Sequence, residues 1–473
     1  MGDPKGFLKI KRSKTPYRPV EERIKDFKEV ALLRPVDKAV EQASRCMDCG
    51  TPFCHWACPV GNYIPEWNDA LYKKEFKKAY ELLSATNTLP EITGRLCPAL
   101  CEYSCVLGIN DDPVTIRENE LNIIEYAFEN GWVKPNPPQK RTGKRVAVIG
   151  SGPAGLTCAT LLNQAGHSVV VFEKADKPGG FLRYGIPDFK LEKHILDRRI
   201  NIYEKEGIVF KTTLNIGLDL TVNELLTDFD AICLTVGSRK PRDLNIPGRE
   251  LEGIYFAVEY LTQANMRVCG KKLENCIDAR DKDVVIIGGG DTGADCVGTA
   301  VRQGAKSIKQ IEIMPKPPEQ RTDEFPWPKY PMILKTSTSH EEGGERHWSI
   351  LTKRFEGSNG KVQKLICVKV DVKKDPKTNR LEITEIPGSE FILKADLVIL
   401  ALGFLHPEKE DLISKLNLEL DERGNIKTKQ NYQTNIEKIF AAGDARRGQS
   451  LIVWAISEGK NAAKNIDDFL RNS

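Results

Sequence analysis

The chain has 473 residues, of which 40% are hydrophobic and 29% charged, and 70 basic against 66 acidic side chains leave a formal net charge of +4. A chain of this length allows about three domains, each large enough to bury its own core. The composition is that of an ordinary globular protein, which excludes a disulfide-stapled miniprotein and a strongly basic nucleic-acid-binding protein. Of the 13 cysteines, seven fall within the first 105 residues, and this clustering requires a chemical explanation.

The N-terminal residues and the hydropathy pattern indicate a cytoplasmic protein. Residues 1–10 are polar and basic and lack the apolar core of a signal peptide. No stretch approaches the roughly 18 apolar residues of a membrane span. We therefore expect reduced thiols and neither a membrane nor a nucleic acid as partner. In a reducing compartment, grouped cysteines indicate metal binding or catalysis rather than disulfide bonds.

The predicted elements divide the chain into a helical front and a longer α/β part. Up to about residue 135, apolar residues recur at helical spacing, as at Leu121, Ile124 and Phe128. Residues 134–143 are rich in proline and basic side chains, which is typical of a linker. Two copies of a strand–helix–strand unit follow. The first has strands at 144–150 and 168–173 with a helix at 156–165 between them. The second has strands at 282–288 and 307–312, with a helix between them that continues through residue 301. Further strands are predicted at 231–237, 365–372, 395–403 and 439–444, and an irregular surface loop at 314–331.

The first glycine loop is typical of a dinucleotide-binding site. It reads Gly150, Ser151, Gly152, Pro153, Ala154 and Gly155 between a predicted strand and a predicted helix. The first glycine allows a tight turn, the second lets the backbone approach a pyrophosphate, and the third lets the helix pack on the strand. Glu173 ends the next strand, where a carboxylate binds ribose hydroxyls. The alternative interpretation is a structural glycine turn in an unrelated α/β domain.

The second glycine loop repeats this pattern. It reads Gly288, Gly289, Gly290, Asp291, Thr292 and Gly293, and Glu312 ends the following strand. Two dinucleotide sites indicate a resident and a diffusible carrier, and FAD with NADH or NADPH is the usual pair, because flavin accepts a hydride and releases single electrons. Glu312 favours a bare ribose diol and repels a 2′-phosphate, so NADH is expected over NADPH. Arg302, Lys306 and Lys309 could still pair with a phosphate, although a solvated face is the alternative interpretation.

The clustered cysteines form two groups. Cys46, Cys49, Cys54 and Cys58 have the spacing C-x2-C-x4-C-x3-C-P, and Cys97, Cys101 and Cys105 have the spacing C-x3-C-x3-C. Such thiolates are typical of iron–sulfur ligation, and zinc is the alternative. A one-electron acceptor beside a flavin completes a redox chain, which favours iron–sulfur. Two four-iron clusters need eight ligands, so one ligand is missing, and the candidates are His55, Glu102, Glu118 and Glu120. The other six cysteines are isolated and are expected to be mostly core residues.

These motifs together resemble the small (β) subunit of glutamate synthase and its relatives. The resemblance extends over essentially the whole chain, including residues 46–54, 64–68, 94–98, 148–155, 179–187, 288–295 and 441–450. It implies that Gly443 and Asp444 contact FAD and that Gly179, Gly180, Gly185 and Gly237 line the flavin. It also implies one cluster on Cys46, Cys49, Cys54 and Cys105 and another on Cys58, Cys97, Cys101 and Glu120.

The expected architecture is therefore α/β, with two Rossmann-like dinucleotide-binding domains preceded by an α-helical iron–sulfur domain. Residues 1–140 would bind two 4Fe-4S clusters, 141–280 and 396–473 would form a discontinuous FAD domain, and 281–395 would be an inserted NAD(P)H domain. No catalytic side chain is expected, since the two cofactors perform the hydride transfer.

The resemblance implies an electron-input subunit that oxidises NAD(P)H and serves a large (α) subunit making L-glutamate from L-glutamine and 2-oxoglutarate, in a hetero-oligomer. Two alternatives stay open at this point. One is a related flavin and iron–sulfur subunit that feeds another acceptor, such as a transhydrogenase or a ferredoxin-linked complex. The other is a non-catalytic zinc-bearing scaffold.

Overall fold

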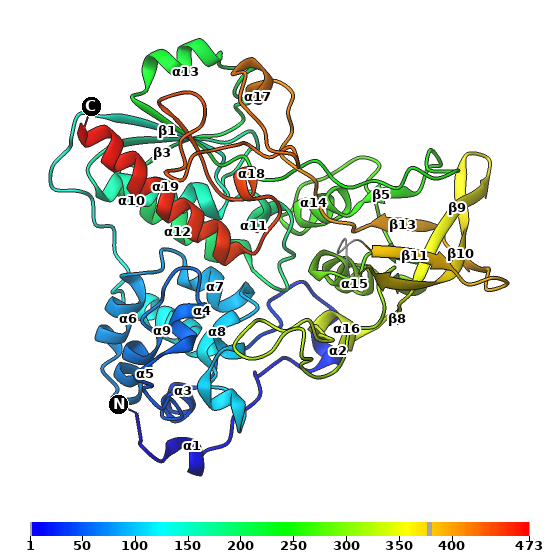
Figure 1. Cartoon of the computed structure of the whole chain (residues 1–473), viewed down its shortest axis with the longest axis horizontal. Helices are drawn as coiled ribbons and strands as arrows, with labels where there is room; N and C mark the ends of the chain where they lie inside the picture. Colours follow the sequence, from blue (N-terminus) through cyan, green and yellow to red (C-terminus); the bar gives the residue numbers. More distant parts are fainter. Residues whose placement is uncertain (1, 376–380, 473) are drawn as a thin grey trace.

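The structure is a computed structural model that describes residues 2–375 and 381–472, and it contains an N-terminal module and two α/β units (Figure 1). The N-terminal module is helical, as the apolar spacing predicts. Its elements are α1 (Gly6–Lys9), α2 (Val20–Arg23), α3 (Val36–Ala43), α4 (Phe53–Ala57), α5 (Ile64–Tyr72), α6 (Phe76–Ser84), α7 (Pro90–Leu96), α8 (Leu100–Tyr103), the 3-10 helix η1 (Val106–Ile109) and α9 (Ile116–Glu129). The predicted linker at 134–143 contains neither helix nor strand.

The first α/β unit is built on a five-stranded parallel sheet. Its order is β14-β4-β1-β2-β3. The central strands are apolar and buried, as parallel strands covered on both faces must be. Its elements are β1 (Arg145–Ile149), α10 (Pro153–Gln164), β2 (Ser168–Phe172), α11 (Phe181–Tyr184), α12 (Lys193–Lys205), β3 (Val209–Lys211), α13 (Val222–Asp228), β4 (Ala231–Leu234), α17 (Leu412–Lys415), β14 (Ile439–Ala441), α18 (Asp444–Arg447) and α19 (Ile452–Asn472). Because β14 comes from the C-terminal part of the chain, this unit is discontinuous in sequence.

The second α/β unit contains another parallel sheet, ordered β5-β13-β6-β7-β8, and an antiparallel extension of β9 to β12. Its elements are β5 (Ile254–Phe256), α14 (Ala257–Val268), β6 (Asp283–Ile287), α15 (Asp291–Gln303), β7 (Ser307–Ile311), α16 (Thr338–Glu342), β8 (Glu345–His347), β9 (Ile350–Ser358), β10 (Lys361–Lys374), β11 (Leu381–Glu385), β12 (Phe391–Lys394) and β13 (Leu397–Leu400). Strand β13 pairs with β6 on one side and with β5 on the other, so both β5 and β13 belong to this sheet. Sheet membership therefore gives the inserted unit a wider extent, 254–400, than the predicted 281–395.

The N-terminal module packs against both α/β units (Figure 1). The Arg199 guanidinium on α12 donates to both carboxylate oxygens of Glu91 on α7, at 2.6 and 2.9 Å. The predicted loop at 314–331 has no helix or strand, and it reaches the module rather than standing free in solvent. There the ring of Trp327 lies 4.6 Å from that of Phe53, centroid to centroid.

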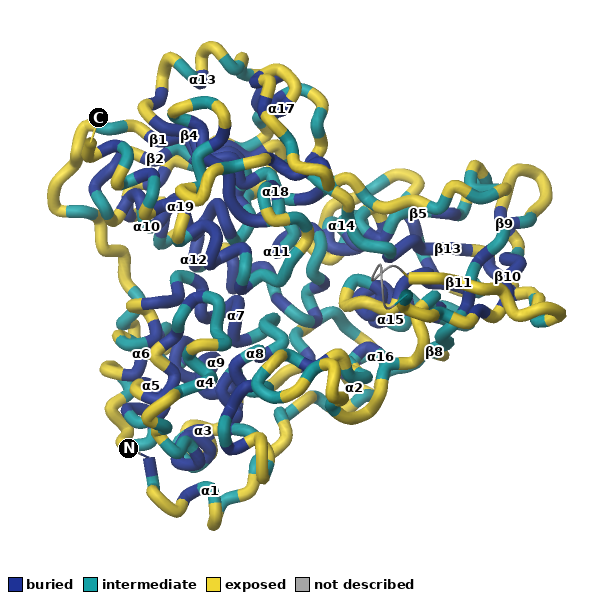
Figure 2. Tube along the Cα trace, in the orientation of Figure 1, coloured by how far each residue is buried: buried dark blue, intermediate teal, exposed yellow. Residues whose placement is uncertain are grey.

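The buried residues, dark blue in Figure 2, form several cores, and the core of the first α/β unit continues into the N-terminal module through Val60, Leu89 and Ile92. Of the six isolated cysteines, Cys158, Cys233, Cys296 and Cys367 are buried, as expected for core residues. Cys269 is exposed, because it follows the last turn of α14 at the surface, so the core interpretation is wrong for this residue. None of the helices within the described residues has the length and apolar character needed to cross a membrane.

Candidate functional site

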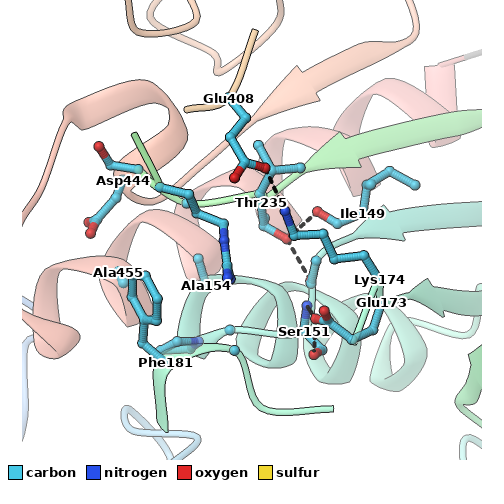
Figure 3. A pocket seen from close by; sticks show the side chains of 18 of the residues that line it. Ile149, Ser151, Ala154, Glu173, Lys174, Phe181, Thr235, Glu408, Asp444 and Ala455 are labelled. Atoms are coloured by element: carbon cyan, nitrogen blue, oxygen red, sulfur yellow. Dashed lines mark hydrogen bonds and ion pairs between the residues drawn. The ribbon is translucent and has the colours of Figure 1, made fainter. Parts of the chain in front are cut away.

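The first glycine loop forms the floor of a cavity of about 380 Å³ in the first α/β unit (Figure 3). Gly150 has a φ of +101°, which favours glycine, and a Cβ on Gly155 would stand 2.0 Å from the Gly150 carbonyl oxygen. A Cβ on Gly152 would meet nothing within 4 Å, so the backbone there faces open space. Since α10 begins at Pro153, its unpaired N–H groups lie at this loop, which is the arrangement that binds a pyrophosphate.

Two carboxylates face the first cavity from opposite sides (Figure 3). Glu173 Oε2 accepts hydrogen bonds from the Ser151 backbone N–H at 3.1 Å and from the Ser151 hydroxyl at 2.6 Å. Asp444 Oδ1 accepts a hydrogen bond from the Ser450 hydroxyl at 2.7 Å. Burial raises the pKa of Asp444 to about 6. Both carboxylates can accept hydrogen bonds from the hydroxyl groups of a nucleotide.

Most residues expected to bind FAD line this cavity. They are Gly150, Gly152, Pro153, Ala154, Glu173, Gly180, Gly237 and Asp444. Gly443 and Gly179 contact lining residues: a Cβ on Gly443 would stand 2.8 Å from the Ala154 Cβ, and the Gly179 N–H donates to Ser151 Oγ at 2.8 Å. Gly185 ends α11 and lies away from the lining. Phe181 and the Lys174–Glu408 pair, which has an N–O distance of 2.5 Å, also line the cavity. Phe181 lies within the resemblance segment 179–187 but was not singled out, and no motif marks the pair.

The second glycine loop lines a larger cavity, of about 1,090 Å³. All of its expected residues except Gly293 line this cavity, together with Glu312. Gly293 instead allows close packing, because a Cβ there would stand 2.3 Å from the Gly288 carbonyl oxygen. Glu312 Oε2 accepts from the Gly289 N–H at 2.6 Å, which repeats the bond between Glu173 and Ser151 in the first loop.

Side chains that sequence reasoning did not single out support the second loop. Gln310 Nε2 donates to the Gly288 carbonyl oxygen at 2.7 Å, and His340 Nε2 donates to Gln310 Oε1 at 2.8 Å. Lys190, from the segment before α12, forms an ion pair with Asp295 on α15, and both line the cavity. These contacts join segments far apart in sequence, so no local pattern could reveal them.

None of the three cations considered for a 2′-phosphate lines the cavity that Glu312 lines. Arg302 is fully buried and its guanidinium contacts Glu342 at 2.5 Å. Lys306 contacts Asp283 at 3.2 Å, and Lys309 lies within β7 outside the cavity lining.

The two cavities adjoin each other and the cysteine-bearing module. Ile186, Ser450, Leu451 and Ile452 line both cavities. Cys97 lines the second cavity as well. The second cavity therefore adjoins the first cavity, and the second glycine loop and Cys97 both contribute to its lining.

Four of the seven clustered cysteines surround one small cavity in the N-terminal module. They are Cys46, Cys49, Cys54 and Cys105. Burial raises the pKa of Cys46 to about 12 and also raises that of Cys54. Neutral thiols are therefore favoured unless a metal or cluster stabilises the thiolates.

The other three cysteines gather around Glu120. The Cys101 thiol lies within electrostatic range of Cys58, Cys97 and Glu120. Glu120 accepts hydrogen bonds from Asn87 Nδ2, at 2.9 Å, and from the Thr93 hydroxyl, and burial raises its pKa to about 7.

The other candidates for the missing ligand have partners of their own. Glu102 pairs with Arg12, Glu118 pairs with Arg34, and the His55 ring stacks on Tyr63.

The donor sets of both groups suit iron–sulfur clusters, because soft thiolates dominate them. In the part of the chain that the structure describes, no three His, Cys, Asp or Glu side chains are placed to hold a single metal ion. A four-iron cluster is a larger body, which its ligands surround from separate directions. Cys58 and Cys97 also pack against the core of the first α/β unit, so the Glu120 group (Cys58, Cys97, Cys101 and Glu120) lies where the module meets that unit.

Comparison with known proteins agrees with this arrangement. Residues 144–459 match the family described as pyridine nucleotide-disulphide oxidoreductase, and residues 23–132 match dihydropyrimidine dehydrogenase domain II, 4Fe-4S cluster. The chain is 50% identical to the glutamate synthase [NADPH] small chain of Mycobacterium tuberculosis, over 100% of this chain and 97% of that protein. The chain belongs to the glutamate synthase small-chain family.

As a member of this family, the chain is an oxidoreductase with a 4Fe-4S domain at its N-terminus. It is also 47% identical to glutamate synthase [NADH] of Schizosaccharomyces pombe, where 98% of this chain corresponds to 22% of the longer protein. FprA of Mycobacterium tuberculosis, solved in complex with NADPH, superposes with a TM-score of 0.55 at 18% identity, over 71% of this chain and 85% of FprA. That likeness shows the fold of the α/β part, and the expected architecture is confirmed.

Proposed function

We propose that this chain is the electron-input subunit of a glutamate synthase. It would oxidise a nicotinamide nucleotide at FAD and pass electrons through two 4Fe-4S clusters to a large subunit that makes L-glutamate from L-glutamine and 2-oxoglutarate. The observation that carries the proposal is the meeting of the two cavities with Cys97, since it would bring nucleotide, flavin and cluster together. The similarity to proteins named as glutamate synthase small chains supports a large subunit as the partner of this chain.

The residues of the chain would bind and orient the cofactors. The first loop, Glu173 and Asp444 would hold FAD, and the second loop would hold the nicotinamide nucleotide. Flavin supplies the change from hydride to single-electron chemistry when it is bound. The walls shared by the cavities, Ile186 and residues 450–452, are mainly apolar and would exclude water from the place of hydride transfer.

The two cysteine groups would form a relay that leads away from the flavin. The Glu120 group packs against the first α/β unit and would receive electrons first. The group around Cys105 lies in the module's own core and would pass them on. Glu120 would supply the eighth ligand.

Glu312 supports a preference for NADH. Its carboxylate lies at the position that contacts the adenosine ribose in such loops, and like charge opposes a 2′-phosphate there. None of the three cations considered as phosphate partners lines the second cavity. The relatives carry both nucleotide names, so this preference requires a direct measurement.

The experiment combines purification with kinetics. We expect the native protein to co-purify with a large glutamine-hydrolysing chain, and the recombined pair to form glutamate with NADH at a higher kcat/KM than with NADPH. The small chain alone should reduce an artificial acceptor but form no glutamate.

Two results would contradict this proposal. A different stable partner would indicate a related subunit that feeds another acceptor. A purified chain without flavin and iron–sulfur absorbance would indicate the zinc-bearing scaffold.

A further inference from the structure

Three arginines and two glutamates lie beside the Glu120 group, at the start of α9. Glu102 pairs with Arg12 at 2.6 Å, and Glu118 pairs with Arg34. Each carboxylate therefore has an arginine of its own. The third arginine, Arg117, has no carboxylate within ion-pair distance of its guanidinium among the described residues. One positive charge is thus left over in this cluster of side chains.

The unpaired charge is held close to the Glu120 group. The Arg117 backbone N–H donates to Glu102 Oε1 at 2.9 Å, which fixes the start of α9. Arg117 NH1 lies 3.5 Å from the Cys97 carbonyl oxygen. The guanidinium lies within electrostatic range first of Glu102 and then of Glu118, which already have arginine partners, and also of the Cys97 thiol and the Glu120 carboxylate.

Arg117 is in addition a half-buried residue of the second cavity's lining. Arg117 and Cys97 therefore line the same cavity. An arginine keeps its charge at any pH that a protein tolerates. Its effect on a neighbouring redox centre is therefore permanent rather than dependent on protonation.

A fixed positive charge stabilises the form of a redox centre that carries more negative charge. Reduction of a 4Fe-4S cluster adds one electron and no proton, so the reduced cluster gains more from a nearby cation than the oxidised cluster does. The result is a higher reduction potential. In a partly buried site this attraction is screened less than at the surface.

We propose that Arg117 raises the reduction potential of the cluster that Cys58, Cys97, Cys101 and Glu120 would hold, and so favours electron transfer from the flavin to that cluster. One electron leaves the reduced flavin and reduces this cluster, and no bond forms or breaks in the cluster. Arg117 is therefore a positioning residue: its guanidinium acts through its charge on the cluster and is not one of the cluster's ligands. This inference rests on the proposed function, because it requires that the chain holds FAD and clusters.

The test is a potentiometric titration of the purified holoprotein, monitored by electron paramagnetic resonance. For Arg117→Gln we expect at least a tenfold lower ratio of reduced to oxidised cluster at a fixed potential, which corresponds to about 59 mV for one electron. Arg117→Lys keeps the charge and should shift the ratio much less. Lys78→Gln, an exposed cation on α6 of the same module, is the matched control for net charge and should leave the ratio unchanged.

Each outcome separates the inference from the function on which it rests. If the wild-type protein shows no iron–sulfur signal, the proposed function is wrong. If the clusters are present but Arg117→Gln behaves like Lys78→Gln, the inference about Arg117 is wrong. Loss of the cluster in Arg117→Gln and Arg117→Leu, with retention in Arg117→Lys, would assign Arg117 to cluster assembly and would also overturn the inference.

Discussion

His340 is a neutral histidine that supports the second glycine loop through Gln310. Its Nδ1 accepts from the Ser337 backbone N–H at 3.2 Å, and its Nε2–H donates to Gln310, which in turn bonds the Gly288 carbonyl. Burial lowers the pKa of His340 to about 4, and Arg346 and Lys190 act in the same direction. At the residue scale, the loop's shape thus depends on an imidazole that resists protonation.

The lowered pKa of His340 predicts a specific dependence of stability on pH. The unfolded chain, with a histidine pKa near 6.5, binds more protons than the folded chain between about pH 6.5 and 4. Stability from this residue is complete above pH 6.5 and falls as the pH drops through that window. We expect the urea midpoint of His340→Gln to lie closer to that of the wild type at pH 5 than at pH 7.5. A constant difference between the two proteins would contradict this.

At the scale of elements, the turn from β1 into α10 has two glycines with different roles. A Cβ on Gly155 would stand 2.0 Å from the Gly150 carbonyl and 2.7 Å from Thr235 Oγ1, so it would force the helix away from the strand. A Cβ on Gly152 would enter open space in the first cavity. Packing therefore depends on Gly155, and room for a ligand depends on Gly152.

The Gly155→Ala and Gly152→Ala variants should therefore have different effects, the first on stability and the second on flavin binding. We expect Gly155→Ala to lower the free energy of unfolding by about 1–3 kcal/mol, the usual cost of overpacking. Gly152→Ala should change it little, because its φ of −67° suits any residue, but should lower the ratio of bound flavin to protein after purification. Urea unfolding of the flavin-free protein and flavin absorbance measure these effects. Equal destabilisation by both variants would be inconsistent with this division of roles.

The two strand–helix–strand units were predictable from sequence, whereas other elements, including the long helix α19 and the short strands β3, β5 and β8, were not. The two strand–helix–strand units lie where the β-branched runs and the helical spacing predicted them. Strands β3, β5 and β8 have three residues each, too few for a period to emerge. Their existence depends on a neighbouring strand, as β5 depends on β13.

At the scale of the whole molecule, a buried ion pair joins the N-terminal module to the first α/β unit. Glu91 is fully buried and Arg199 nearly so, and they form a bidentate contact between α7 and α12. Removal of one partner leaves the other charge buried and unpaired. Such a loss is strongly destabilising, although the intact pair itself contributes little net stability.

We expect Glu91→Gln to lower the free energy of unfolding by about 3–5 kcal/mol. The double replacement Glu91→Leu with Arg199→Met should recover most of that loss, since no charge then stays unpaired. Lys73→Gln, which breaks the exposed contact between Lys73, at the C-terminal end of α5, and Asp69, is the control and should change stability little. Urea unfolding checks all three variants. A Glu91→Gln protein as stable as the control would show that the interface does not depend on this pair.

The local motifs were determined by the sequence alone. Each glycine loop and its carboxylate lie within one strand–helix–strand unit, where short-range geometry is decisive. Only the tertiary structure decided which distant residues meet. Cys105 joins Cys46, Cys49 and Cys54, and Glu120 joins Cys58, because helix packing rather than spacing brings them together. The shared wall of the two cavities likewise combines Ile186 with residues 450–452, a long-range contact that no local pattern encodes.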